Sequence, residues 1–129
     1  MTTRDLASQL SAQFSTLVGE PFEFRGEATL VVADPERIQE VCAYAKQVLG
    51  CNFLLDITSI DNYGEAPRWT VVYELYGLGH HCHLRLKTRV SEEKSELPTV
   101  TGVWRTADWH EREIYDMMGV RFRGHPDLR

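Results

Sequence analysis

The chain has 129 residues, a formal net charge of −5, 43% hydrophobic residues and 26% charged residues. This length fits one domain of ordinary size, and the apolar fraction suffices for a core, which argues against wholesale disorder. An acidic chain is a poor nucleic-acid binder, because phosphate contact needs a basic surface. Residues 1–66 carry ten acids and four bases, whereas residues 67–129 carry nine and ten. The acidic half either solubilises the protein, which we favour, or faces a basic partner.

The three cysteines, Cys42, Cys51 and Cys82, are odd in number and form no CxxC pair. This argues against a disulfide framework and against a four-cysteine zinc or iron–sulfur site, and favours a reducing compartment. The N-terminus leads into an amphipathic pattern, unlike an apolar signal segment. No run of residues approaches the roughly 20 apolar residues of a membrane span, so we expect any membrane link to go through a partner.

The N-terminal half predicts a helix, two strands and a second helix. Apolar residues at helical spacing run from Leu6 to Val18, and Thr2 with Asp5 forms a capping box before them. Two short strands, 22–25 and 29–33, read as a hairpin.

Asp34 and Pro35 begin the second helix as N-cap and first helical residue, and Gly50 ends it. The predicted buried stripe of this helix comprises Ile38, Val41, Cys42, Ala45, Val48 and Leu49.

Three alternating runs follow, at 52–60, 68–76 and 81–90, and short turns between them predict an antiparallel meander. The residues predicted to face the core are Phe53, Leu55 and Ile57, then Trp69, Val71, Tyr73 and Leu75, then Cys82, Leu84 and Leu86. The opposite side of the third run carries His81, His83, Arg85, Lys87 and Arg89.

We predict a loop at 91–98 and a last helix that begins near Thr106 or Asp108 and stops at Gly119. Residues 121–129 lack a regular period, so we expect an extended segment that needs a surface to lie against. The resulting order, α-β-β-α-β-β-β-α, predicts one α+β domain over residues 1–129, with a mostly antiparallel or mixed sheet of about five strands and two to three helices.

The sequence His80-His81-Cys82-His83 contains residue types that bind transition metals. On a strand, neighbouring side chains point to opposite faces, so at most His81 and His83 share a side. We therefore favour core packing for Cys82 and a solvated or partner-facing basic face over a metal site.

A second chemical hypothesis concerns the last helix, where His110 and Glu111 resemble the start of a zincin motif. Position 114 is Ile, so the second histidine is absent. Glu111, Glu113 and Asp116 could form an acid–base site together with His110 and His125. Because Arg112 and Asp116 have the spacing of an i,i+4 ion pair, we favour a helix stapled by charge pairs.

The segment Trp109-x-Glu111-Arg112-Glu113-x-Tyr115-Asp116-Met117-x-Gly119-Val120-x-Phe122-x-x-His125-Pro126-Asp127-Leu128-Arg129 resembles the signature of the C subunit (30 kDa subunit) of complex I, respiratory NADH:quinone oxidoreductase. The preceding Pro98-Thr99-Val100-Thr101-x-x-Trp104 is similar to that family's lead-in. The family has an α+β fold, and it continues into a tail that wraps the D subunit, so the resemblance implies that this tail is absent from these 129 residues.

The resemblance implies a subunit without an active site or cofactor of its own, within a complex that uses FMN, iron–sulfur clusters, NADH and quinone. Its expected partners are the D (49 kDa) subunit and the B and I subunits. We expect it to lie peripherally at the cytoplasmic face of the membrane, bound only through the complex. Residues 98–129 would dock the partner. The expected interface residues are Trp109, Glu111, Arg112, Glu113, Asp116, Phe122, His125, Asp127 and Arg129.

Two alternatives remain open. The family has relatives in membrane-bound hydrogenases and in ferredoxin-dependent complex I-like enzymes, so the motif does not decide the electron donor. The other alternative is a small metal- or acid–base-dependent enzyme that uses residues 80–83 or 110–116.

Overall fold

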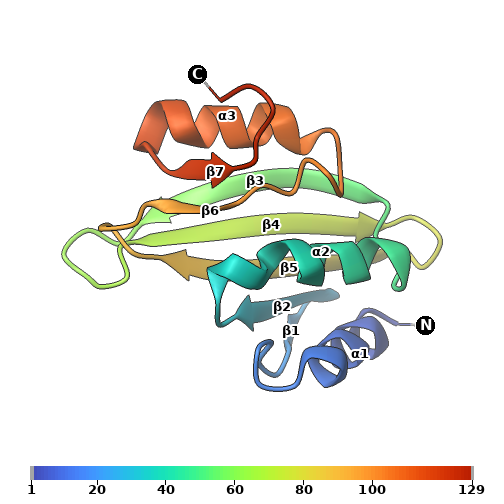
Figure 1. Cartoon of the computed structure of the whole chain (residues 1–129). Coiled ribbons are helices and arrows are strands. Elements are labelled where there is room, and N and C mark those ends of the chain that lie inside the picture. The colour runs from blue at the N-terminus through green and yellow to red at the C-terminus, as the bar shows by residue number, and fades with distance from the viewer. Residues whose placement is uncertain (1, 129) are drawn as a thin grey trace.

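The structure, a computed structural model, describes residues 2–128, and its main layer is a five-stranded mixed sheet (Figure 1). The elements are α1 (Thr3–Phe14), β1 (Phe22–Phe24), β2 (Glu27–Val32), the 3₁₀ turn η1 (Pro35–Arg37), α2 (Ile38–Gln47), β3 (Phe53–Asp61), β4 (Trp69–Gly77), β5 (Cys82–Val90), β6 (Glu96–Pro98), α3 (Ala107–Met118) and β7 (Arg121–Arg123). The predicted α+β class is confirmed.

The sheet has the strand order β1-β2-β5-β4-β3, with the predicted meander of β3, β4 and β5 at its centre and one edge. The predicted hairpin of β1 and β2 is also present, and β2 joins the meander by pairing in parallel with β5. A parallel pair requires a crossover, which α2 and the strands after it provide. β3 and β1 are therefore the two edges of the sheet.

The helix boundaries follow the predicted caps with two differences. Thr2 and Asp5 form the capping box of α1, but this helix ends at Phe14 because Ser15 adopts a positive φ of 49°. The residues after it still reach the core, where Val18 bridges to Val32. Asp34 accepts a hydrogen bond from the Glu36 N–H, but the turn that it caps is 3₁₀ before it becomes α-helical.

Helix α2 buries the predicted stripe except for Val48, which is 60% exposed and therefore corrects the prediction. Gly50 follows with a left-handed φ of 76°, as expected for the end of this helix.

One face of the sheet carries the core, and the helices cover that face (Figure 1). On the other face, the alternate residues of β5 are exposed or half-buried, which matches the expected basic stripe. There Glu74 and Glu27 form ion pairs with Arg85, and both carboxylates also lie next to the His83 ring. No helix within residues 2–128 has the length and apolar character needed to cross a lipid bilayer.

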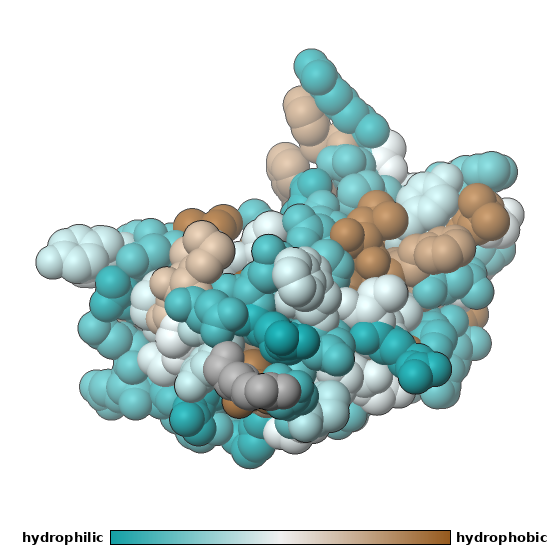
Figure 2. Space-filling model, turned by 90° about the horizontal axis from the view of Figure 1, so that it is seen from above, coloured by the Kyte–Doolittle hydropathy of each residue, from teal (hydrophilic) through white to brown (hydrophobic). Residues whose placement is uncertain are grey.

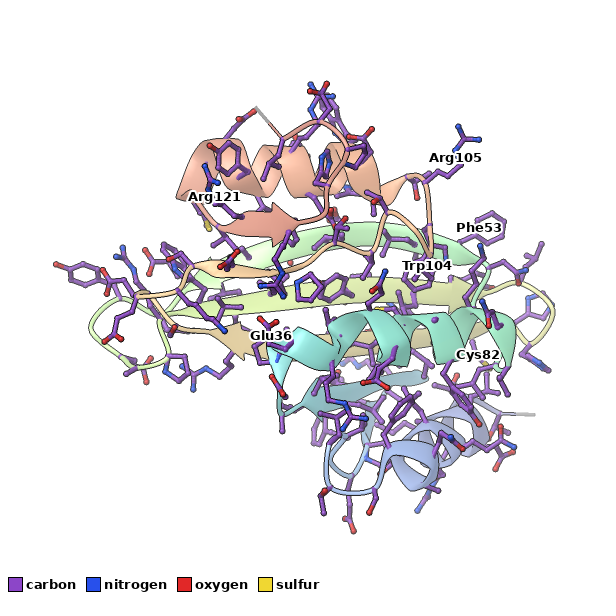
Figure 3. The ribbon with its side chains drawn as sticks, in the orientation of Figure 1. Glu36, Phe53, Cys82, Trp104, Arg105 and Arg121 are labelled. Carbon is purple, nitrogen blue, oxygen red and sulfur yellow. The ribbon has the colours of Figure 1, made fainter. Side chains whose placement is uncertain are left out.

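The alternation of β3 differs from the prediction. The register with β4 shifts between Leu54 and Asp56, which is a β-bulge. As a result Leu54 and Ile57 face the core, whereas Phe53 and Leu55 are 49% and 50% exposed. Figure 3 shows Phe53 pointing outward at the end of the sheet. The prediction that Phe53 and Leu55 are core residues was wrong, because one extra residue in a strand moves the preceding side chains to the other face.

Candidate partner-docking segment

Residues 98–128 form a second layer, in which the extended segment after α3 is a strand. β7 pairs in parallel with β6, and Phe122 at its centre is buried. The pairing continues at both ends, where the Arg121 N–H donates to the Ser95 oxygen and the Thr99 N–H donates to the Arg123 oxygen. The segment thus lies against its own chain. The predicted loop at 91–98 is corrected at its end, where Glu96–Pro98 is β6.

Glu111 is the most buried charged residue of this layer, with no exposed surface. Its carboxylate accepts hydrogen bonds from the Thr99 hydroxyl and from the Val100 N–H, the latter at 2.9 Å. These bonds tie α3 to the turn that follows β6. Burial raises the pKa of Glu111 to about 6, although the two hydrogen bonds and nearby His125 act in the opposite direction.

His125 fastens the end of the segment to the start of α3, and its side chain is fully buried. The Asp127 N–H donates to Nδ1 at 2.9 Å, so the ring proton of a neutral imidazole lies on Nε2. Nε2 then donates to the Asp108 backbone oxygen at 3.0 Å. Asp127 itself is exposed, and its main chain supports this bond.

The opposite side of α3 faces solvent. Trp109, Glu113, Asp116 and Met117 recur at i, i+4, i+7 and i+8, and all four are exposed. Trp109 is 61% exposed and Met117 is 80% exposed. Figure 2 looks down on this side and shows a mostly hydrophilic surface interrupted by separate apolar clusters. We call these four residues the outer face of α3.

The nine expected interface residues therefore divide into two groups. Glu111, Phe122 and His125 have buried side chains that hold the layer together. Trp109, Arg112, Glu113, Asp116 and Asp127 are exposed or half-buried. Arg129 lies outside the described residues. Whether any of them contacts a partner stays a prediction.

The expected ion pair between Arg112 and Asp116 is not formed, which corrects the prediction. Arg112 instead lies 4.0 Å from Asp108, one helical turn toward the N-terminus. Asp116 has no ion pair within residues 2–128. Because the basic residue is equidistant in sequence from both acids, spacing alone could not choose between them.

We expect Asp116→Ala to change the free energy of unfolding by less than about 0.5 kcal/mol, because the carboxylate is exposed and has no ion pair with residues 2–128. Urea denaturation of the isolated protein measures this change. A loss of more than about 1 kcal/mol in the free energy of unfolding would show that Asp116 stabilises the fold through a contact that the structure does not contain among residues 2–128.

The side chains of the histidine–cysteine cluster at residues 80–83 do not point toward a common site. Cys82 is buried on the covered face of the sheet, whereas His83 lies on the other face, 3.1 Å from Glu74 and 3.3 Å from Glu27. His81 sits in the turn before β5 with a φ of 52°. Within residues 2–128, no three His, Cys, Asp or Glu side chains are placed to hold a metal ion. Burial raises the pKa of the Cys51 thiol to about 12, which is typical of inert core cysteines.

A groove between β3 and α3 was not anticipated from the sequence. It has a volume of about 270 Å³, and its walls are Asp56–Ser59 from the strand and Glu113, Ile114, Met117 and Met118 from the helix. At one end His110 Nδ1 lies 3.2 Å from an Asp56 carboxylate oxygen. The Ser59 hydroxyl is buried there and has no hydrogen-bond partner among the residues that the structure describes. The β-bulge that shapes this edge has no signal in a single sequence.

Comparisons with known proteins bear on this segment. The model of the family described as "Respiratory-chain NADH dehydrogenase, 30 Kd subunit" matches residues 31–129. The C subunit of the NADH-quinone oxidoreductase of Geotalea uraniireducens is 44% identical over 121 residues, which cover 94% of this chain and 73% of that protein. In Rhizobium etli, the C subunit numbered 2 of the same enzyme is 53% identical over 97 residues, and these cover 74% of this chain but only 51% of that protein.

Two solved structures share the fold. The trypsin-resistant fragment (1–134) of Nqo5 superposes with a TM-score of 0.84 and 33% identity, and the match covers 99% of this chain and all of the fragment. A chain of the membrane-bound sulfane sulfur reductase, an archaeal respiratory membrane complex, gives a TM-score of 0.85 over 97% of this chain and 72% of its own length. At 22% identity, the second match shows a common fold alone.

Proposed function

Because the chain belongs to the 30 kDa subunit family of respiratory-chain NADH dehydrogenase, we propose that it is a cofactor-free accessory subunit of a proton-translocating NADH:quinone oxidoreductase. The observation that carries the proposal is 44% identity, over nearly the whole chain, to a protein named as the C subunit of this enzyme. The protein would lie in the peripheral arm at the cytoplasmic face of the membrane. Other subunits, which bind FMN and iron–sulfur clusters, would transfer electrons from NADH to quinone.

The contacts that the motif residues make within their own chain support an accessory role. Glu111 and His125, the strongest acid–base candidates of the motif, are buried and hydrogen-bonded within their own layer. His83 is held between two glutamates on the other side of the sheet. These residues therefore have contacts within the fold that account for their positions.

We place the contact with the D subunit on the outer face of α3. Tryptophan is enriched among the residues that dominate binding energy at protein interfaces, and Trp109 is largely exposed. The carboxylates of Glu113 and Asp116 have no ion pair within residues 2–128, so they can pair with basic residues of a partner. The B and I subunits are proposed as further neighbours.

Co-expression of the full-length gene with an affinity-tagged D subunit tests this proposal. We expect the wild-type protein to copurify with the D subunit, and the double variant Trp109→Ala, Asp116→Ala to bind it at least about tenfold more weakly. Tyr63→Ala is the matched control, because this aromatic ring is 83% exposed but lies in the turn after β3. Failure of the wild-type pair to associate would contradict the proposed function. Equal loss with Tyr63→Ala would contradict only the assignment of the contact to α3.

An alternative proposal is that the chain is the equivalent subunit of a membrane-bound hydrogenase or of a ferredoxin-dependent complex I-like enzyme. The electron donor would then be hydrogen or ferredoxin instead of NADH. The common fold with a chain of an archaeal respiratory membrane complex is compatible with either donor. Activity of the purified assembly with NADH, reduced ferredoxin or hydrogen as the only donor distinguishes them.

A further inference from the structure

The free edge of β3 presents unpaired backbone groups. The Asn62 N–H donates to the Arg68 oxygen at 2.7 Å just beyond the strand, which fixes the hydrogen-bonding phase of the β3–β4 ladder. In an antiparallel pair, alternate residues point their N–H and C=O groups toward the partner strand and away from it. Ile60 and Thr58, at alternate positions before Asn62, therefore also point their backbone N–H and C=O groups toward β4. The backbone groups of the intervening residues Asp61, Ser59 and Ile57 point away from β4, toward the open edge.

One end of this edge is closed beside the β-bulge, and the stretch beyond it is open. At one end the Asp56 carboxylate accepts the outward N–H of Ile57 at 2.9 Å, next to the β-bulge. At the other end the Asp61 side chain is paired with Arg68. Between them the N–H and C=O of Ser59 and the N–H of Asp61 have no hydrogen bond within residues 2–128. Buried or half-buried strand edges in native proteins are normally covered or paired.

The opposite edge of the sheet does not offer the same template. β1 has only three residues and directly follows Pro21, which has no N–H to donate. The unpaired stretch of β3 is therefore specific to one side of the molecule, the side that α3 borders.

The groove between β3 and α3 lies beside this open stretch. Its volume of about 270 Å³ is below the roughly 300–1,000 Å³ of small-molecule sites, which suits inserted side chains better than a cofactor. Met117 and Met118 form an adaptable apolar wall, and Glu113 adds at its rim a carboxylate that has no ion pair among residues 2–128. The buried Ser59 hydroxyl lines the same space and has no hydrogen-bond partner in the described part of the chain.

We propose that an extended segment of another subunit adds to β3 as a sixth strand, pairing with Ser59 and Asp61. In a strand paired this way, the residue opposite Ser59 points its side chain into the groove, so that residue is apolar. Charge complementarity with Glu113 requires a basic residue nearby on the same face of the segment. The exposed Leu55 and Ile60, on the other side of the edge, give the alternate residues an apolar surface to cover.

This inference rests on the proposed function, because it needs an assembly that supplies the segment. Residue-resolved hydrogen exchange tests it directly. In the isolated protein, the amides of Ser59 and Asp61 are expected to exchange at least about 100-fold faster than those of Thr58 and Ile60. In the assembly, purified through a tag on a different subunit, exchange of the Ser59 and Asp61 amides should slow by at least about tenfold.

A proline substitution at one position gives an independent readout. Ser59→Pro removes an N–H that β4 does not use, so the strand keeps its ladder, but the added segment loses a hydrogen bond. We expect Ser59→Pro to be retained in the assembly at least about tenfold less than wild type, whereas Ser59→Ala, which keeps the N–H, is retained normally. The melting temperature of each isolated variant shows whether the fold is preserved.

The outcomes separate the two proposals. If wild-type protein does not copurify with the assembly, the proposed function fails. If it does copurify, and the Ser59 and Asp61 amides still exchange freely, the sixth strand is overturned and the function stands. If these amides are already protected in the isolated protein, and protection grows with concentration alongside a dimer in sedimentation, the occupant is a second copy of the chain and the proposal is also overturned.

Discussion

Replacement of Glu111 by alanine is expected to lower the free energy of unfolding by about 3–5 kcal/mol. The variant leaves the Val100 N–H in a buried site without its acceptor, whereas the Thr99 hydroxyl keeps its hydrogen bonds with Thr101. Each unsatisfied polar group costs about 1–3 kcal/mol, and the removed side chain leaves a cavity beside the core. Urea unfolding followed by tryptophan fluorescence measures the loss.

The matched control is Glu113→Ala, two residues along the same helix. Its side chain is exposed and has no ion pair within residues 2–128, so the expected change is below about 0.5 kcal/mol. If Glu111→Ala were as stable as Glu113→Ala, the buried carboxylate would not be the anchor of residues 98–128. The motif would then have to be explained by contacts outside this chain alone.

The parts of the fold that the sequence predicts well are those with local causes. The capping box at Thr2 and Asp5 and the glycine stops at Gly50 and Gly119 depend on residues within one turn. The meander follows from alternation and short turns, which need no distant contact. Its alternation in β4 and β5 is correct because both strands are regular.

The errors have non-local causes. β6 and β7 have three residues each and pair across more than twenty residues of sequence, so no periodic pattern could reveal them. The bulge in β3 depends on how that strand meets β4 and α3, and it reverses the expected burial of Leu55. Arg112 selects Asp108 over Asp116, although both have the same spacing. The unusual composition of segment 98–128 is visible in the sequence, but which of its residues are buried becomes visible only in three dimensions.

The division of the motif into buried and exposed residues refines its interpretation. A family signature records residues needed for folding and residues needed for binding without separating them. Here the burial of Glu111 and His125 explains one part of the signature as internal fastening. The outer face of α3 and the adjoining edge of β3, the surfaces that we propose for contact with other subunits, border the same groove.

The raised pKa of Glu111 predicts a distinctive pH dependence of stability. The pKa of this group is about 6 in the folded protein against an ordinary value of 4.5, so below pH 4.5 it is protonated in both the folded and the unfolded state. As pH rises from 4.5 to 6, the unfolded chain loses this proton first, which favours unfolding. The group therefore lowers the free energy of unfolding by about 2 kcal/mol above pH 6, relative to acidic pH.

Glu111→Gln isolates this effect from the other titrating groups. Its side-chain oxygen can still accept from the Val100 N–H, and its amide can donate to Thr99, but it carries no proton to lose. We expect the stability of Glu111→Gln minus that of wild type to increase by about 2 kcal/mol between pH 4 and pH 7. Urea titrations at unit pH intervals measure this difference, with Glu113→Gln as the exposed control that should show none. A difference that stays constant would mean that folding does not shift the pKa of Glu111, and one that falls with pH would mean that folding stabilises its carboxylate as an anion; either result contradicts the prediction.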